Sequence, residues 1–298
     1  MEAGLKLLQH LDQVMDEKNG YPEEPTWGYA FSLLAALESK IYGNFDLFKE
    51  KSLSFYLSQS KPKKSYSWEF TVYAMQRAVR IYKINKVDFQ LDKYQEKGTR
   101  MVNWTLLRQL NRMNAGQSKL ISMLIISLIK KLFTTDEGQI LDERKTRSYQ
   151  YHCFCLFVIA EIYEQHPSES LKNWYIEGCD FINRQALDSG VALYIGRGQE
   201  QIFGYGALLY SLTYAQEKFG FNANALPKIW SHVKGFQRQD GSIPLVLNKC
   251  QPEEPQVMFK ANKPNGWYGY NTLYDYQPFL AYCLLRASKL EPKYDNKD

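Results

Sequence analysis

Apolar residues recur at intervals of three and four along most of the chain, the spacing that gives an α-helix one apolar face. Eleven such stretches follow one another, and glycine, proline or other turn-forming residues lie near their ends. We therefore predict an all-α chain with helices over residues 2–17, 25–41, 45–59, 66–83, 88–110, 115–133, 147–165, 168–186, 200–219, 223–238 and 270–289.

Two short stretches, 191–195 and 241–247, have β character and are predicted as small loop strands. Residues 248–267 contain several prolines and little periodicity, which predicts a long ordered loop. Eleven or twelve helices in 298 residues fit either an α/α toroid or an α-solenoid. Because no consensus repeats at a fixed period, we predict a single α/α-toroid domain over residues 1–298, an incomplete or complete six-hairpin barrel.

The net charge of +5 comes from scattered basic residues, so nucleic acid is not predicted as a partner. A small positive excess is compatible with an acidic polysaccharide. The most apolar window, residues 120–133, is too short to span a membrane and is predicted as a buried core helix. The first helix lacks the apolar core of a signal peptide, so the expected location is the cytoplasm.

The five cysteines have neither disulfide-framework nor metal-ligand spacing, and we predict reduced, mostly buried thiols. Phosphate-binding glycine loops, dinucleotide fingerprints and metal-ligand motifs are not found in the sequence, so no cofactor and no metal are predicted. Aromatic residues make up 15% of the chain, with 22 tyrosines. Flat rings with polar tips are typical of sugar-binding sites, although most rings fill the space between helices.

The richest polar cluster lies at the start of the helix over 147–165. Helical spacing allows Tyr151 and His152 to face one cavity, with Arg147 and Tyr149 nearby. A tyrosine beside a positive charge can exchange a proton next to a carboxylate, because that charge favours the phenolate. The alternative is that these residues cap and pack a helix. Asn114, before the most apolar helix, either neutralises a substrate carboxylate or caps the helix.

The second cluster lies between glycines before the helix over 200–219. Arg197 suits a carboxylate, Gln199 and Gln201 suit sugar hydroxyls, and Glu200 is the best-placed acid for a hydrolase. Plain helix capping is the alternative.

The third cluster interleaves aromatic rings with Asn and Asp over residues 265–278. It is predicted to be a stacking platform for sugar, with Trp267 and Tyr270 among its rings, as is Tyr205 in the second cluster. Asp275 is either a general acid or a hydrogen-bonded structural residue.

The run from Arg147 to His152, followed by an apolar helix, resembles the heparinase II/III and alginate-lyase group of polysaccharide lyases, in which a Tyr-His step opens a helix of an α/α toroid. The resemblance spans residues 111–154 and implies Tyr151 as base or acid, His152 as its partner, and Asn114 or Asn111 as the group that neutralises a carboxylate. The usual Asn-His pair is missing. The loop around Arg197 and residues 239–242 also resemble the unsaturated glucuronyl hydrolases.

These patterns together predict an enzyme that acts on an acidic, uronate-containing polysaccharide or oligosaccharide by β-elimination with a Tyr/His acid-base pair. The alternatives are a glycoside hydrolase, a uronate epimerase and a non-catalytic helical binding protein. The predicted catalytic residues are Tyr151, His152, Arg197, Asn114 and Glu200, and the predicted substrate-binding residues are Arg147, Tyr149, Gln199, Gln201, Tyr205, Trp267, Tyr270 and Asp275.

Overall fold

The computed structural model describes residues 1–59, 66–84, 96, 98–247 and 272–290, and these residues form eleven α-helices and no β-strand. The all-α prediction is therefore confirmed for the described part of the chain. The helices are α1 Glu2–Val14, α2 Gly28–Ser39, α3 Asp46–Ser58, α4 Tyr66–Tyr82, α5 Val102–Asn114, α6 Lys119–Phe133, α7 Tyr149–Gln165, α8 Glu169–Gln185, α9 Ile202–Phe219, α10 Leu226–Gly235 and α11 Leu273–Leu290.

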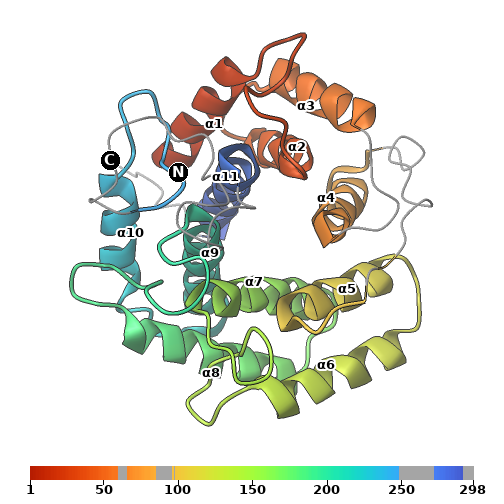
Figure 1. The fold of residues 1–298 in the computed structure, drawn as a ribbon, viewed down its shortest axis with the longest axis vertical. Helices are drawn as coiled ribbons and strands as arrows, with labels where there is room; N and C mark the ends of the chain where they lie inside the picture. The colour runs from red at the N-terminus through yellow and green to blue at the C-terminus, as the bar shows by residue number, and fades with distance from the viewer. Residues whose placement is uncertain (60–65, 85–95, 97, 248–271, 291–298) are drawn as a thin grey trace, which may run out of the picture.

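Six of these helices form a closed inner ring. In the order α2, α4, α5, α7, α9 and α11, each packs against the next, and α11 closes the ring by packing against α2 (Figure 1). The other helices, α1, α3, α6, α8 and α10, lie outside this ring. The arrangement is the predicted α/α toroid.

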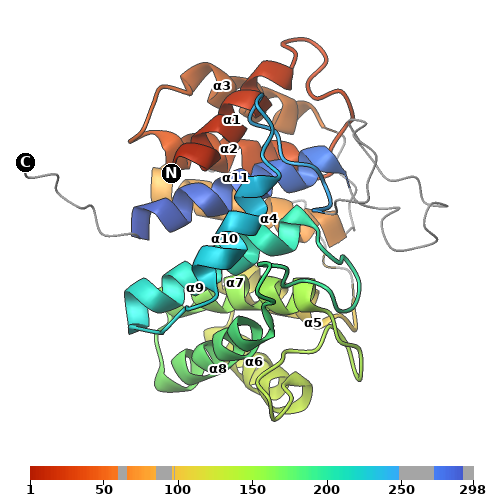
Figure 2. The same cartoon turned by 90° about the vertical axis from the view of Figure 1, so that its left-hand side faces the viewer.

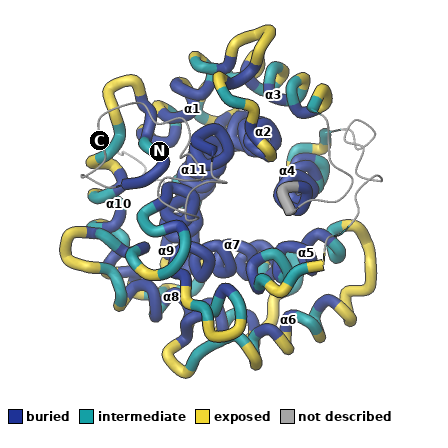
Figure 3. The backbone as a smooth tube through the Cα atoms, in the orientation of Figure 1, coloured by how far each residue is buried: buried dark blue, intermediate teal, exposed yellow. Residues whose placement is uncertain are grey.

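Burial separates the two sets of helices (Figure 3). Every residue of α9 from Ile202 to Ala215 is buried, because α9 contacts neighbours on all sides. In α1, by contrast, only one apolar face is buried, and polar residues such as Lys6 face solvent. A helix that is apolar all round belongs in the centre, and an amphipathic one at the outside.

The inner helices start at the same end of the barrel, which we call the mouth end. Figure 2 shows α9 and α11 running side by side in the same direction. Ring contacts near the starts of all six inner helices, described below, show that the other inner helices run in this direction too. Side chains on the first two turns of inner helices therefore gather at one place although they are far apart in sequence.

Some local predictions differ from the structure. The helix predicted over 88–110 begins at Val102, and residues 98–101 before it are not helical, whereas 85–95 and 97 lie outside the described residues. Neither predicted loop strand forms: residues 191–195 are irregular, and in 241–247 only Val246 makes an isolated bridge, to Gln201. The loop predicted over 248–267 lies outside the described residues.

The helix α6 is not the buried core helix that its composition predicts. It packs against α5 on the outside of the ring and exposes one side to solvent. Its apolar pattern covers both faces, so the pattern alone did not reveal which face would be buried.

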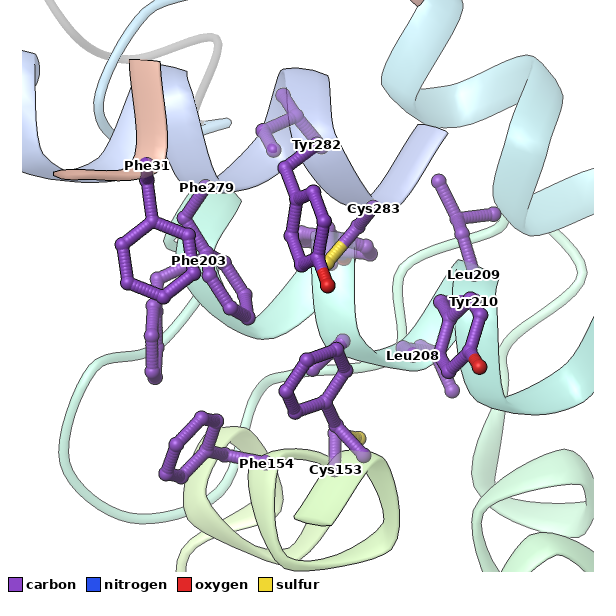
Figure 4. Close-up of a cluster of buried hydrophobic side chains, with 14 of the residues drawn as sticks. Phe31, Cys153, Phe154, Phe203, Leu208, Leu209, Tyr210, Phe279, Tyr282 and Cys283 are labelled. Carbon is purple, nitrogen blue, oxygen red and sulfur yellow. The ribbon is translucent and has the colours of Figure 1, made fainter. Parts of the chain in front are cut away.

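Aromatic and sulfur-containing side chains fill the middle of the barrel (Figure 4). Phe157 on α7 contacts the rings of Phe279 and Tyr282 on α11 with centroid separations of 5.4 and 6.4 Å. Four cysteines, Cys153, Cys155, Cys179 and Cys283, are buried free thiols whose pKa values are raised by burial. The predicted burial is thus confirmed for the described cysteines.

An ionic network lies further along the inner helices, away from the mouth end. The fully buried carboxylate of Glu161 on α7 accepts hydrogen bonds from Arg77 on α4 and Arg286 on α11. Burial alone would raise the pKa of Glu161, but the two guanidinium groups hold it below its usual value. Arg286 also donates to the hydroxyl of Tyr210 over 2.6 Å, which ties α9 into the network.

Candidate functional site

A group of aromatic rings closes the barrel at the mouth end, and each inner helix contributes one ring. Trp27 before α2 stacks on Phe70 of α4 at 4.6 Å, and Phe203 of α9 stacks on Tyr276 of α11 at 5.0 Å. Trp27 and Tyr276 complete the circle at 5.9 Å. We call this group the aromatic collar; its members are Trp27, Phe70, Trp104, Phe154, Phe203 and Tyr276.

The collar separates the interior of the barrel from its mouth. Trp27, Phe70 and Tyr276 each keep 5 to 6% of their surface exposed, whereas the rings beneath them, such as Phe31 and Phe279, keep none. The exposed edges are therefore on the mouth side. Indole and phenol rings at such a position offer flat apolar faces with polar tips, which suit the faces of sugar rings.

A glycine loop holds Arg197 against the start of α7. Gly196 and Gly198 have φ values of +86° and +73°, and a Cβ on either would lie 2.2 Å or less from the backbone of Arg147 or the side chain of Gln150. Only glycine permits this approach. The loop is fixed by the hydrogen bond from Ser148 Oγ to the carbonyl of Arg197, 2.9 Å long.

This placement brings together two residues that the sequence analysis selected from different clusters. The guanidinium carbon of Arg197 lies 4.9 Å from the ring centre of Tyr151. Arg197 also donates to Asp142 Oδ2 over 2.6 Å and contacts the sulfur of Met101, which precedes α5. Its side chain is 34% exposed, and Tyr151 is 8% exposed. The contacts of Arg197 therefore join the starts of α5, α7 and α9.

Asp142 was not predicted as a site residue, although it lies only nine residues before Tyr151 in the sequence. It is 1% exposed, and its Oδ1 has no hydrogen-bond partner among the described residues. Burial raises the pKa of Asp142, and the neighbouring charge of Arg197 opposes that rise. Nothing in a single sequence indicates that residue 142 lies next to residue 197, since the contact depends on the packing of two loops.

His152 points away from Tyr151 and into the protein. Its Nδ1 accepts a hydrogen bond from the backbone of Ile140 and its Nε2 donates to the carbonyl of Gly178, both at 3.0 Å. It is fully buried, and burial lowers its pKa to about 4, so the ring is neutral at pH 7. These contacts join α7 to α8 and to the turn before residue 142, which is a structural role.

The side chains of two further residues selected near α7 have partners other than Arg197. The Tyr149 hydroxyl donates to Gln185 of α8 over 3.2 Å, and its ring packs on Phe181. Arg147 is half exposed and lies 3.6 Å from Glu137 on the surface.

The remaining residues of the second cluster lie in two places, Gln201 beside α7 and Glu200 beside the outer helix α10. Gln201 is buried, and its Oε1 accepts from Gln150 Nε2 over 3.1 Å, while Gln199 is partly exposed. The carboxylate of Glu200 accepts from the Tyr205 hydroxyl over 2.8 Å and lies 3.1 Å from His232 of α10. Glu200 therefore connects α9 to an outer helix.

Asp275 acts as the cap of a neighbouring helix. Its carboxylate accepts hydrogen bonds from the backbone N–H groups of Thr26 and Trp27 and from the hydroxyls of Thr26 and Thr272. Burial raises the pKa of this carboxyl group, and the donated hydrogen bonds oppose the rise. The structure thus matches the second of the two roles considered for Asp275, a hydrogen-bonded structural residue.

Asn114 is at the wrong end of α5 for a role beside Arg197. Met101, which Arg197 contacts, directly precedes α5, whereas Asn114 is its last residue. At 1.5 Å per residue these positions are about 20 Å apart. The other asparagine considered, Asn111, donates to the carbonyl of Glu69 on α4 over 2.9 Å.

Trp267 and Tyr270 lie outside the described residues, so their predicted stacking role stays a prediction. Among the residues that the structure describes, no group of three or more His, Cys, Asp or Glu side chains is arranged to hold a metal ion.

Comparison with solved structures shows what this fold is similar to. A cellobiose 2-epimerase from Bacillus thermoamylovorans matches with a TM-score of 0.71 at 13% identity, over 95% of this chain and 98% of the epimerase. A polysaccharide lyase matches with a TM-score of 0.64 at 11% identity, over 98% and 99% of the two chains. The unsaturated glucuronyl hydrolase of Bacillus sp. GL1 matches at 0.65 and 9% identity, over 95% and 96%.

The chain has the α/α-toroid fold of these carbohydrate-active enzymes. The suspected resemblance to toroid lyases and glucuronyl hydrolases is confirmed at the level of fold. No protein family matches the sequence, and no curated protein matches it. At 9 to 13% identity the likeness establishes the fold.

Proposed function

We propose that this chain is a carbohydrate-active enzyme whose site lies at the mouth end, beside the aromatic collar. The observation that carries the proposal is the position of the Arg197 guanidinium, 4.9 Å from the Tyr151 ring and partly open to solvent. A cation, a phenol and a set of aromatic faces thus meet where the inner helices start. The toroid fold of the matched enzymes supports the same class of function.

The substrate of this site is an acidic, uronate-containing glycan. Arg197 binds the uronate carboxylate, because a guanidinium matches the geometry of a carboxylate. Buried Asp142 holds Arg197 in position through the 2.6 Å ion pair. Collar rings with exposed edges, Trp27 and Tyr276, contact the faces of neighbouring sugars.

Tyr151 transfers the proton in this reaction. Its phenolate takes the proton from the carbon next to the carboxylate, and the adjacent positive charge stabilises that phenolate. The electron pair left behind forms a carbon–carbon double bond as the glycosidic carbon–oxygen bond breaks, and the leaving oxygen takes up a proton. Return of the proton to the opposite face without bond cleavage would give an epimerase instead.

A hydrolase is the second candidate, and the state of Asp142 favours it. A buried carboxyl group with raised pKa and one oxygen without a hydrogen-bond partner among the described residues has the properties of a general acid. Glu200 and Asp275 fit that role less well, because both oxygens of each carboxylate have hydrogen-bond partners within the protein.

The test is an assay on a panel of acidic polysaccharides and oligosaccharides that follows two products. Ultraviolet absorbance reports the new double bond, and a reducing-sugar assay reports hydrolysis. We expect absorbance to rise with the wild type and to be lost in Tyr151→Phe and Arg197→Ala. Tyr149→Phe is the matched control, because its hydroxyl contacts α8 and not Arg197.

The outcomes separate the candidates. Reducing sugar without absorbance, lost in Asp142→Asn, would establish the hydrolase and refute elimination. Inversion at one carbon without either signal, followed by nuclear magnetic resonance, would establish the epimerase. Binding of glycans without any turnover would favour a non-catalytic binding protein.

A further inference from the structure

The outward face of α6 is a stripe of aliphatic side chains. Helical geometry places its members on about one third of the helix circumference. Ser122, Ile126 and Ile129, on the opposite side, are buried. We call these residues the α6 stripe; they are Leu120, Ile121, Leu124, Leu128 and Leu132, and each is between 56% and 72% exposed.

Such a stripe is unusual for the outside of this protein. The α6 stripe holds five of the twelve large exposed hydrophobic residues found in the described part of the chain. None of the others lies on the outer helices α8 and α10. Scattered apolar side chains at a surface need no explanation, but a contiguous row marks a contact surface. Figure 3 shows exposed and buried residues alternating along α6.

The charge around the stripe is positive. Helix α6 carries Lys119, Lys130 and Lys131 and no acidic residue. A cavity of about 590 Å³ beside α6 is lined by Ile129 and Phe133 of α6 and by Arg100, Arg144 and Glu143. Arg100 and Arg144 are exposed. The apolar stripe thus lies on a helix with three lysines and no acid, close to the exposed Arg100 and Arg144, which complements an anionic surface.

A second copy of the chain fits this surface poorly. Helical spacing places Lys131 on the same face as Leu124 and Leu128. Pairing of two α6 stripes would bring lysines together without an acid on either helix. A transmembrane role is also excluded for α6, since 15 residues make a helix of about 22 Å, shorter than the hydrocarbon core of a bilayer. No described helix is long and apolar enough to cross a membrane.

We propose that α6 docks this protein on the surface of an anionic lipid bilayer. The helix lies in the plane of the interface, with the α6 stripe inserted at the boundary between headgroups and acyl chains. Lys119, Lys131, Arg100 and Arg144 contact the headgroup phosphates, which adds an attraction that salt weakens.

The experiment is sedimentation of the full chain with vesicles of phosphatidylcholine alone or with added phosphatidylglycerol. We expect binding to the anionic vesicles only, weaker at high salt. Leu124→Glu with Leu128→Glu should lower the partition coefficient by at least about tenfold. Leu47→Glu with Leu57→Glu on α3 is the matched control, because these exposed leucines receive the same charge change elsewhere. Lys119→Glu with Lys131→Glu should abolish the preference for anionic lipid.

Three results would overturn the proposal. The first is an absence of wild-type binding to anionic vesicles, and the second is equal binding to both kinds of vesicle. The third is a dimer in solution that Leu124→Glu with Leu128→Glu abolishes, without vesicle binding, because the stripe would then cover a second copy. Circular dichroism of each variant verifies that α6 and its neighbours remain folded.

Discussion

The replacement of Asp275 by alanine tests whether the mouth end depends on this residue for stability. The carboxylate accepts hydrogen bonds from two backbone N–H groups at the start of α2. Without it the buried N–H of Trp27 loses its acceptor, which costs about 2–3 kcal/mol, and the partly buried N–H of Thr26 costs about 1 kcal/mol. The hydroxyls of Thr26 and Thr272 can rotate toward other acceptors. We therefore expect Asp275→Ala to lower the free energy of unfolding by about 3–4 kcal/mol.

The assay is urea unfolding followed by circular dichroism, with the change read from the midpoint at a constant slope. Asp240→Ala is the control. Asp240 also accepts a backbone N–H, from Ser242, but its side chain is 55% exposed, so its loss should cost less than about 1 kcal/mol. A loss below about 1 kcal/mol in Asp275→Ala would refute the capping role. Wild-type stability combined with complete loss of activity would instead establish Asp275 as a catalytic acid.

Three further predictions concern other parts of the barrel. The pKa of His152 is about 4 in the folded protein and 6.5 when unperturbed, so the unfolded chain binds the proton more tightly. The free energy of unfolding should therefore fall by about 3 kcal/mol as the pH is lowered from 6.5 to 4. Urea midpoints of His152→Gln measured across this range should lack that fall. Glu161→Ala leaves buried guanidinium groups without a counter-charge and should cost about 3–5 kcal/mol, measured by urea unfolding; a cost below about 1 kcal/mol would contradict the network. Gly198→Ala should displace Arg197 and lower activity by about tenfold or more, because the new Cβ would lie 1.9 Å from the Gln150 amide. Gly220→Ala is the control: Gly220 has a similar φ, no atom lies within 4 Å of the added Cβ, and activity should be unchanged.

The positions of the helices could be predicted because apolar periodicity is a local signal. The helix predicted over 147–165 is observed as Tyr149–Gln165, and that over 200–219 as Ile202–Phe219. The identity of the exposed face of α6 could not be predicted, since apolar residues occupy both of its faces. The toroid was predicted from the number of helices and from the lack of a repeated consensus sequence, and no single residue indicated it.

The candidate site could be predicted only in part. The glycines around Arg197 indicated a close backbone approach, and the structure places that approach against α7. The roles of His152 and Asp275 could not be predicted, because the backbone groups that they bond lie 12 to 249 residues away along the chain. A side chain that satisfies a distant backbone group looks the same in sequence as one that meets a substrate. The sequence predicted Tyr151 and His152 as an acid-base pair, whereas in the structure Tyr151 faces Arg197 and His152 bonds Ile140 and Gly178.

The closure of the inner ring by α11 has a consequence for the order of folding. Helix α11 packs between α9 and α2, so the last inner helix to be synthesised completes the contacts of the first. Until it leaves the ribosome, apolar flanks of α2 and α9 have no partner, and the nascent chain presents them to chaperones or to other chains. The contacts that then form join residues about 250 apart, such as Thr26 and Asp275, and closing so long a loop slows folding. A chain that stops before Leu273 would therefore be left as an open arc prone to aggregation.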